Sequence, residues 1–237
     1  MPVLAVYIVP HADTVLYQVG SDFLGYDIRA GKKFTPLLVA KYGEATVIPW
    51  IKRARPFGFH ATLGDAMEYD EELLSEVKMR LQWISTRVSP FMLTNGRFHD
   101  TFRGVPRVLS ATFDSPDGTL QELHRLVVTM INVLHRSSPF SARMESFDND
   151  DKEFIIRYGM PHARLLDRFD LHFSFATTLP TNEEEHVYEE LKDEIVKRTG
   201  LFQRDDHQVL NVDEICLLKQ SDDDSYFHIV ETYPLGE

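Results

Sequence analysis

The sequence is poor in cysteine, in long apolar runs and in metal-ligand spacings, and each shortage excludes a class of protein. The one cysteine, Cys216, excludes an intramolecular disulfide and any thiolate-rich zinc or iron–sulfur site, and we interpret it as a buried, inert thiol. No apolar run approaches the ~18 residues of a membrane span, and the apolar start of the chain lacks the basic flank of a signal peptide. No HxH or HExxH spacing occurs. We therefore expect no metal, no cofactor, no membrane contact and a cytoplasmic location.

Basic residues are scarce towards the C-terminal end. The chain carries 25 Lys and Arg against 37 Asp and Glu, a net charge of −12. Residues 1–180 hold 20 basic and 21 acidic side chains, whereas residues 181–237 hold 5 and 16. A duplex nucleic acid needs several Lys and Arg to neutralise its phosphates, so we expect no such partner. The acidic stretch is interpreted as a solvated helix face and a turn, and the neutral part can still bind a small phosphorylated ligand.

The hydrophobic pattern predicts one α+β domain over residues 1–237. With 237 residues and 43% hydrophobic side chains, the chain can bury one large core. Alternating apolar positions predict strands, and apolar positions three and four apart predict helices. The predicted strands are 3–9, 56–63, 90–113 (interrupted by Asn-Gly and Arg-Gly turns), 168–179, 209–220 and 226–235. The predicted helices are 12–24, 69–87, 117–136 and 181–200, with an irregular segment at 25–50 and a short helix and loop at 152–165.

Two predicted strands carry the same short motif, a histidine followed two residues later by a hydroxyl. Side chains two apart in a strand share a face. His60 and Thr62 therefore share one face and His172 and Ser174 share another, each with small neighbours, while phenylalanines fill the opposite face. The two strands lie 112 positions apart in a weakly duplicated chain. The same spacing at His99 and at His135 falls in a turn-rich stretch and at a helix end, so we leave those two out; the remaining histidines are interpreted as surface or capping residues.

Two imidazoles that face one cavity suit general acid–base catalysis near neutral pH. One takes a proton from the attacking water or hydroxyl, and the other gives a proton to the leaving oxygen. Displacement at phosphorus needs these groups on opposite sides of the phosphoryl group, which two strands related by a pseudo-twofold axis would provide. The hydroxyls of Thr62 and Ser174 would donate hydrogen bonds to the non-bridging oxygens. The pattern is therefore typical of a phosphoesterase, although a polar pair at a sheet edge gives the same pattern.

The stretches FGFHATL and LHFSFATTLP resemble the paired motifs of the 2H phosphoesterase superfamily. LYQVGSDFLGYDIRAG, PFGFHATL and RYGMPHARLLDRFDLHFSF are similar to the branch associated with phosphonate metabolism, and the similarity spans nearly the whole chain. The resemblance implies a bilobal, duplicated fold with two antiparallel sheets facing a central cleft and helices outside. It implies metal-independent cleavage or formation of cyclic phosphodiesters, with His60, Thr62, His172 and Ser174 as the catalytic set.

Further residues near the motifs are candidates for substrate binding. Arg55 and Arg168 precede the two motifs and can bind phosphate, unless they are ordinary surface arginines. Arg157 can bind phosphate and Tyr158 can stack on a base or sugar, and Tyr7 on the first strand can line the cleft or belong to the core.

The sequence departs from the branch at one place beside the first motif. The branch has a lysine after HATL, whereas this chain has Gly64 and then Asp65. We expect a phosphoesterase that acts on a small cyclic phosphodiester, such as a 2′,3′-cyclic nucleotide or a ribose cyclic phosphate. A non-catalytic module that binds a nucleotide or phosphosugar and an enzyme for cyclic phosphate ends of RNA are the alternatives. The sequence leaves open the oligomeric state, the direction of the reaction and which histidine is the acid.

Overall fold

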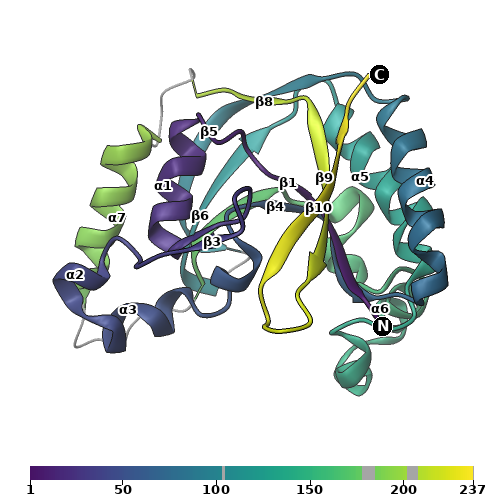
Figure 1. Ribbon diagram of the computed structural model, residues 1–237, viewed down its shortest axis with the longest axis horizontal. Coiled ribbons are helices and arrows are strands. Elements are labelled where there is room, and N and C mark those ends of the chain that lie inside the picture. Colours follow the sequence, from purple (N-terminus) through teal and green to yellow (C-terminus); the bar gives the residue numbers. More distant parts are fainter. Residues whose placement is uncertain (103–104, 178–184, 202–207, 237) are drawn as a thin grey trace.

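The computed structural model describes residues 1–102, 105–177, 185–201 and 208–236, and it confirms the α+β class. Two strands of two residues each, β2 and β3, form a separate small sheet, and the others form one large sheet (Figure 1). The strands are β1 (Val3–Ile8), β2 (Tyr26–Asp27), β3 (Lys32–Lys33), β4 (Ala61–Glu68), β5 (Phe91–Phe102), β6 (Val105–Asp114), β7 (His172–Ala176), β8 (Leu210–Val212), β9 (Glu214–Gln220) and β10 (Phe227–Pro234).

The large sheet is antiparallel at every ladder and has the strand order β10-β9-β1-β4-β7-β6-β5-β8. This order divides into two halves of four strands each, β10-β9-β1-β4 and β7-β6-β5-β8, which meet where β4 lies beside β7. Within the described residues, the ladder that joins them consists of one register pair, Ala61 with Phe173, which we name the seam pair. The two predicted sheets are thus the two four-stranded halves of one sheet, held together by a narrow seam.

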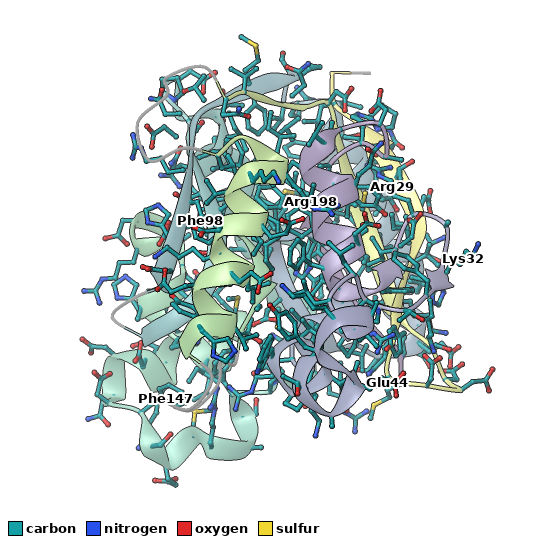
Figure 2. The ribbon with its side chains drawn as sticks, turned by 90° about the vertical axis from the view of Figure 1, so that its left-hand side faces the viewer. Arg29, Lys32, Glu44, Phe98, Phe147 and Arg198 are labelled. Carbon is teal, nitrogen blue, oxygen red and sulfur yellow. The ribbon has the colours of Figure 1, made fainter. Side chains whose placement is uncertain are left out.

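Helices cover the outer sides of the two halves, as predicted. α1 and α7 lie side by side over the half that contains β5 and β6, and α4 and α5 cover the other half (Figures 1 and 2). The first turn of α1 is capped by Thr14, and Gly25 ends the helix in the left-handed conformation, as its sequence predicts. The helices are α1 (Val15–Leu24), α2 (Val39–Tyr42), α3 (Glu44–Ile51), α4 (Leu74–Ser85), α5 (Thr119–Met130), α6 (Asn149–Tyr158) and α7 (Glu185–Thr199).

The predicted strand 209–220 is two strands in the structure. β8 pairs with β5 at one end of the sheet, whereas β9 pairs with β1 and β10 near the other end. Only Asp213 separates β8 from β9, so the ends of the strand order must approach each other and the sheet must curl. The predicted hairpin of the last two strands is confirmed as β9 with β10.

The predicted Asn-Gly turn inside 90–113 is wrong. Asn95 has a positive φ of 52°, yet β5 continues through it, and the register with β6 shifts between Thr94 and Arg97. This irregularity is a β-bulge, which uses the same left-handed conformation that a turn would use. The predicted Arg-Gly turn at 103–104 and the predicted cap of the last helix at 181–182 lie outside the described residues.

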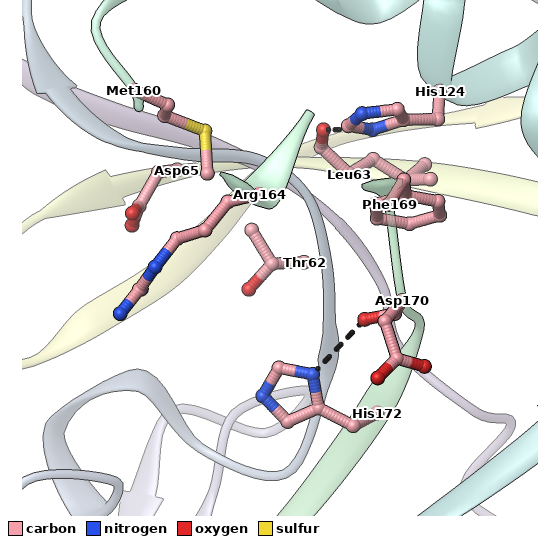
Figure 3. A pocket seen from close by; sticks show the side chains of 9 residues that line it. All are labelled: Thr62, Leu63, Asp65, His124, Met160, Arg164, Phe169, Asp170 and His172. Carbon is pink, nitrogen blue, oxygen red and sulfur yellow. Dashed lines mark hydrogen bonds between the residues drawn. The ribbon is translucent and has the colours of Figure 1, made fainter. Parts of the chain in front are cut away.

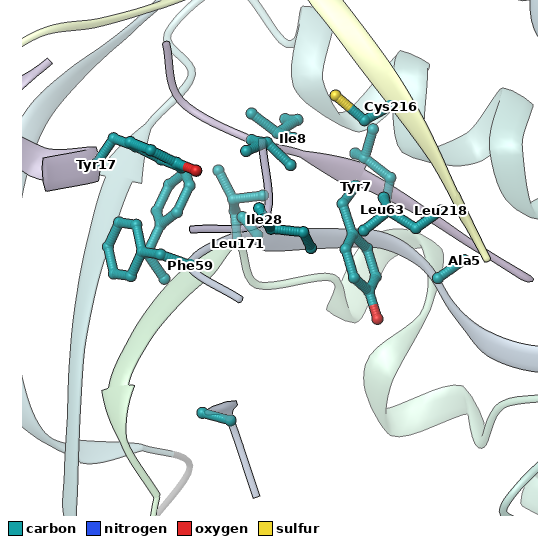
Figure 4. Close-up of a cluster of buried hydrophobic side chains, with 14 of the residues drawn as sticks. Ala5, Tyr7, Ile8, Tyr17, Ile28, Phe59, Leu63, Leu171, Cys216 and Leu218 are labelled. Carbon is teal, nitrogen blue, oxygen red and sulfur yellow. The ribbon is translucent and has the colours of Figure 1, made fainter. Parts of the chain in front are cut away.

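The first strand and β4 are buried together at the centre of the core (Figure 4). Tyr7 and Leu63 are 1% and 0% exposed, and Cys216 beside them is 0% exposed. Burial raises the pKa of the Cys216 thiol to about 12, so the prediction of a buried, unreactive thiol is confirmed. None of the helices in the described part of the chain is both long enough and apolar enough to cross a membrane.

Candidate active site

The structure brings the two motifs together on either side of the seam pair. Continuing the antiparallel register by one residue in one direction places Thr62 opposite His172. Continuing it by one residue in the other direction places His60 opposite Ser174. By this register each histidine is level with the hydroxyl residue of the other motif, while the hydroxyl that contacts the His60 ring is that of its own motif, Thr62, at 3.3 Å. The two histidines are diagonal neighbours, a relation that separates residues by about 7–8 Å in a regular ladder.

Thr62, His172 and Ser174 lie in strands, where the alternation predicted from the sequence applies. His60 comes directly before β4, because the predicted strand 56–63 begins only at Ala61, after a 3₁₀ turn at Arg55–Phe57. The seam pair itself, Ala61 and Phe173, is 0% exposed and points into the core, where Phe173 packs against Phe59. The motif residues alternate with these core residues and remain half-buried. The neighbouring strands continue the polar row, because Tyr7 pairs with Thr62 and Thr112 pairs with His172.

Each catalytic candidate histidine is held in the same way. The Nδ1 atom of His60 lies 2.9 Å from the carbonyl oxygen of Gly58, and that of His172 lies 3.2 Å from the carbonyl oxygen of Asp170. In both cases the carbonyl belongs to the residue two positions earlier. A carbonyl can only accept, so Nδ1 carries the proton and donates it in both neutral rings. In the neutral form, Nε2 of each ring is then the atom that can take up a proton.

The surroundings of His60 keep its ring neutral. Tyr7 stacks on it with ring centroids 3.7 Å apart and an interplanar angle of 16°. Burial lowers the pKa of His60 to about 4, and the nearby His172 adds to the lowering, so the two rings interact electrostatically. The Nε2 atom of His60 lies 3.3 Å from the hydroxyl of Thr62, which donates to it because Nδ1 holds the ring proton. His60 is thus a neutral acceptor at neutral pH.

A pocket opens where β4 and the segment 160–172 diverge from the seam pair (Figure 3). It has a cavity volume of about 140 Å³, which is smaller than the ~300–1,000 Å³ of typical small-molecule sites. Figure 3 shows Thr62 and His172 at its centre with Arg164 across from them. The residues that line it are Thr62, Leu63, Asp65, His124, Met160, Arg164, Phe169, Asp170 and His172.

Charged groups of both signs face this pocket. Asp65 comes from β4, and Arg164 and Asp170 come from the opposite segment. Burial raises the pKa of Asp65, and Arg164 offsets part of that rise. The guanidinium of Arg164 lies 5.2 Å from the ring centroid of Phe140, a cation–π contact that orients it. Arg164 was missed at the level of sequence, because no local pattern distinguishes it from a surface arginine.

The structure explains the glycine after the first motif. A Cβ atom at Gly64 would lie 2.8 Å from Oδ1 of Asn132 and 3.0 Å from Cγ1 of Val127. Position 64 therefore has no room for a lysine. A positively charged side chain reaches the pocket from elsewhere, because Arg164 lines it from the 3₁₀ turn His162–Arg164 that precedes the second motif.

His124 is buried, which corrects its interpretation as a surface or capping residue. It is 1% exposed and stacks on Phe169 with ring centroids 3.7 Å apart. Its Nδ1 donates to the carbonyl oxygen of Leu63 at 3.0 Å, and its Nε2 accepts from the backbone N–H of Leu166 at 3.2 Å. Burial lowers its pKa to about 4. The neutral ring of His124 on α5 thus forms hydrogen bonds with both β4 and the segment 160–172.

The structure does not bring the other predicted binding residues to this pocket. Arg55 is half-buried and donates to the carbonyl oxygen of Phe34 at 3.2 Å. Arg157 is exposed on α6 and lies over the ring of Tyr158, 5.2 Å from its centroid. Arg168 is exposed and does not line the pocket. Tyr7 does reach the site, but it is buried against His60.

Among the described residues, no group of three or more His, Cys, Asp and Glu side chains is placed to hold a metal ion. The groups that face the pocket are proton-transfer and hydrogen-bonding groups. Of the two motifs, Thr62 and His172 line the pocket, His60 lies behind Thr62 with its Nε2 3.3 Å from that hydroxyl, and Ser174 does not line the pocket.

No family model and no curated protein matches this sequence. Solved structures that it resembles include Escherichia coli LigT complexed with 3′-AMP, at 12% identity over 100% of both chains and a TM-score of 0.49. Another is TT0787 of Thermus thermophilus, at 15% identity over 99% of this chain and 98% of that one, with a TM-score of 0.47. A third is a phosphoesterase, at 12% identity over 100% of both chains and a TM-score of 0.46.

Proposed function

We propose that the protein is a phosphoesterase that opens a small cyclic phosphodiester by general acid–base catalysis with His60 and His172. The observation that carries the proposal is the matched pair of imidazoles on either side of the seam pair. In the neutral form each ring carries its proton on Nδ1, which donates to the carbonyl two residues before it, so that Nε2 holds the lone pair that can take up a proton. If each motif were only a polar pair at a sheet edge, there would be no reason for the two histidine rings to lie close together, as they do across the seam pair.

The electrostatics favour His60 as the base in hydrolysis. Its lowered pKa keeps it neutral at pH 7, so it can accept the proton of the attacking water. As the new P–O bond forms, the P–O bond to the leaving ring oxygen breaks, and His172, which must enter this step protonated on both ring nitrogens, donates its Nε2 proton to that oxygen. The product is a phosphomonoester with a free hydroxyl. In the reverse direction the two roles exchange.

The hydroxyls of Thr62 and Ser174 complete the site. Thr62 donates to Nε2 of His60 in the free protein, so the incoming substrate must displace this contact. The freed hydroxyl would then donate to a non-bridging phosphoryl oxygen, where negative charge builds up. Ser174 would do the same from the other motif.

The proposed substrate class is a 2′,3′-cyclic nucleotide or a ribose cyclic phosphate, and the sequence resemblance adds a link to phosphonate metabolism. The test is hydrolysis of a panel of these cyclic phosphates by the wild type, His60→Ala and His172→Ala. Loss of a true general acid or base lowers kcat by at least ~100-fold. His228→Ala, a strand histidine on β10 outside the pocket, is the matched control and should keep its activity. Full activity in both site variants would refute the proposal.

A non-catalytic phosphosugar-binding module is the second candidate. The acidic Asp65 in the pocket favours it, because an extra carboxylate does not help to stabilise a phosphoryl transition state. This candidate predicts that a cyclic phosphate raises the melting temperature without being consumed. Turnover that depends on His60 would exclude it.

A further inference from the structure

Asp65 is the pocket-lining residue that the proposed proton transfers leave unused. Its one hydrogen bond among the described residues is the one it accepts from the backbone N–H of Ala66, at 2.8 Å to Oδ1. No ion pair within 4 Å reaches it in the part of the chain that the structure describes. A half-buried carboxylate therefore presents its second oxygen to the pocket as an acceptor.

The position of Asp65 along β4 sets where its partner on a ligand must lie. It is three residues beyond Thr62, and the register of β4 with β1 shifts between Thr62 and Gly64, so β4 is irregular where both side chains line the pocket. A phosphoryl group held by the motifs would therefore leave Asp65 facing the body of the ligand. Figure 3 shows Asp65 and Arg164 on one side of Thr62 and His172 on the other.

The charge of the pocket limits what that ligand body can be. Asp65 and Asp170 are acidic, Arg164 is basic and His124 is held neutral by burial, so the carboxylates outnumber the guanidinium; His172 adds a positive charge in the protonated form that the proposed reaction requires. A singly charged phosphodiester meets one guanidinium and two carboxylates. A further phosphate group on the ligand would add repulsion that Arg164 alone does not offset.

From these observations, and on the basis of the proposed function, we infer that Asp65 selects a hydroxyl-bearing substrate. The substrate would be a singly charged cyclic phosphodiester of a sugar or polyol, with a hydroxyl that donates to the Asp65 carboxylate. Arg164 would lie against the phosphoryl oxygens. Phosphodiesters without hydroxyl groups and those with a second phosphate would be poorer substrates.

The test compares two cyclic phosphates in the wild type and in Asp65→Asn. Ribose 1,2-cyclic phosphate carries hydroxyls, whereas ethylene glycol cyclic phosphate has none. The amide of asparagine keeps the size of the side chain and an acceptor for Ala66. We expect the wild type to prefer the ribose compound by at least tenfold in kcat/KM. Asp65→Asn should lose that preference through a fall in kcat/KM on the ribose compound.

A matched control separates a hydrogen bond from a general effect of charge. Asp170→Asn removes the same charge from the same pocket and leaves the carbonyl that holds His172 in place. An equal loss of ribose preference in both variants would overturn the inference. So would a wild type that does not discriminate between the two compounds, or one that prefers a ribose cyclic phosphate with an added 5-phosphate.

The two proposals fail in different ways. If ethylene glycol cyclic phosphate is hydrolysed in a His60-dependent reaction but Asp65→Asn changes nothing, the proposed function stands and this inference falls. If neither compound is hydrolysed, the proposed function falls. In that case, calorimetry can measure the binding of ribose 5-phosphate and of ethylene glycol monophosphate, which tests the same preference without turnover. If the wild type and Asp65→Asn bind ribose 5-phosphate with equal affinity, the inference about Asp65 is overturned.

Discussion

Tyr7 shows how the surroundings of a single residue decide between roles that its sequence leaves open. On the first strand it is a candidate for substrate binding or for the core. In the structure it is 1% exposed and its ring face covers His60. Burial raises the pKa of its hydroxyl far above the ordinary value, and Asp65 adds to the rise. We therefore expect Tyr7 to act as a positioning residue for His60.

The Tyr7→Phe and Tyr7→Leu variants separate the two roles. If the ring positions His60, phenylalanine keeps the stacking and leaves both kcat and KM within about threefold of the wild type. Leucine loses the stacking and lowers kcat about tenfold or more, with little change in KM. Steady-state kinetics on one cyclic phosphate measures both. A large rise of KM in Tyr7→Phe would instead assign substrate binding to the hydroxyl.

Gly64 is a second residue whose role is steric. Gly64→Ala should lower the free energy of unfolding by about 1–3 kcal/mol, because its Cβ would press on the buried Asn132. Denaturant unfolding measures the loss. In an Asn132→Ala background the obstructing amide is gone, and the same substitution should cost clearly less. An equal cost in both backgrounds would contradict the steric explanation.

Some residues of the site could be predicted from the sequence and others could not. The period of two in a strand is a local property, so the sequence alone assigns His60 and Thr62 to one face and His172 and Ser174 to another. Arg164 reaches the pocket from a short 3₁₀ turn, and no local pattern fixes where such a turn points.

At the scale of elements, the segment 160–172 is the part of the site with the least regular structure. It consists of two short 3₁₀ turns, His162–Arg164 and Leu166–Arg168, before β7 begins. Leu166 has a positive φ of 55°, a conformation that costs energy for a leucine. The hydrogen bond from its N–H to His124 holds it there. A buried side chain on α5 therefore positions a loop that carries two of the charged pocket residues.

This buried histidine makes stability depend on pH. The folded protein holds His124 with a pKa of about 4, whereas in the unfolded chain it titrates near its ordinary value of 6.5. Below pH 6.5 the unfolded state therefore binds the proton first, and stability falls until the pH reaches about 4. For His124 the loss is on the order of 3 kcal/mol.

The His124→Gln variant tests this at two pH values. It should be less stable than the wild type at pH 7, because it loses the stacking on Phe169, and its stability should fall less between pH 6.5 and 4.5. Denaturant unfolding at each pH gives the free energies. His186→Gln, on the exposed surface of α7, should keep the wild-type dependence. The same pH dependence in His124→Gln as in the wild type would be inconsistent with this role.

The division of 209–220 into β8 and β9 shows what sequence patterns miss at this scale. Both pieces have strand-like composition, and the one residue between them, Asp213, does not mark an end in the sequence. Its carbonyl accepts from Leu235, and its carboxylate lies 2.6 Å from Nε2 of His11. The break follows from the curl of the whole sheet, which is a property of long-range pairing.

At the scale of the molecule, the duplicated order of elements has a structural counterpart. Each motif lies at the inner edge of one four-stranded half, where β4 and β7 meet at the centre of the whole sheet through the seam pair. The weak duplication could be predicted from the sequence, but the register could not, because it depends on one pair of residues 112 positions apart. The catalytic geometry is therefore a product of how the halves meet.

The distribution of charge predicts a weak dependence on salt. The acidic C-terminal part would repel an RNA strand, and the pocket presents one arginine to a small ligand. We expect kcat/KM on a 2′,3′-cyclic mononucleotide to fall less than about threefold between 50 and 200 mM salt. An RNA oligonucleotide with a cyclic phosphate end should be no better a substrate. A steep decline with salt, together with preference for the oligonucleotide, would favour the RNA-end alternative.

The central claim is that two imidazoles from distant parts of the chain act on one phosphorus atom. A crystal structure of the protein with vanadate, a mimic of the pentacoordinate phosphorus in the transition state, tests it most directly. The account predicts that Nε2 of His60 and Nε2 of His172 each lie about 2.6–3.2 Å from a different oxygen of the same vanadium centre. Vanadate bound to one histidine alone, or away from the seam, would contradict it.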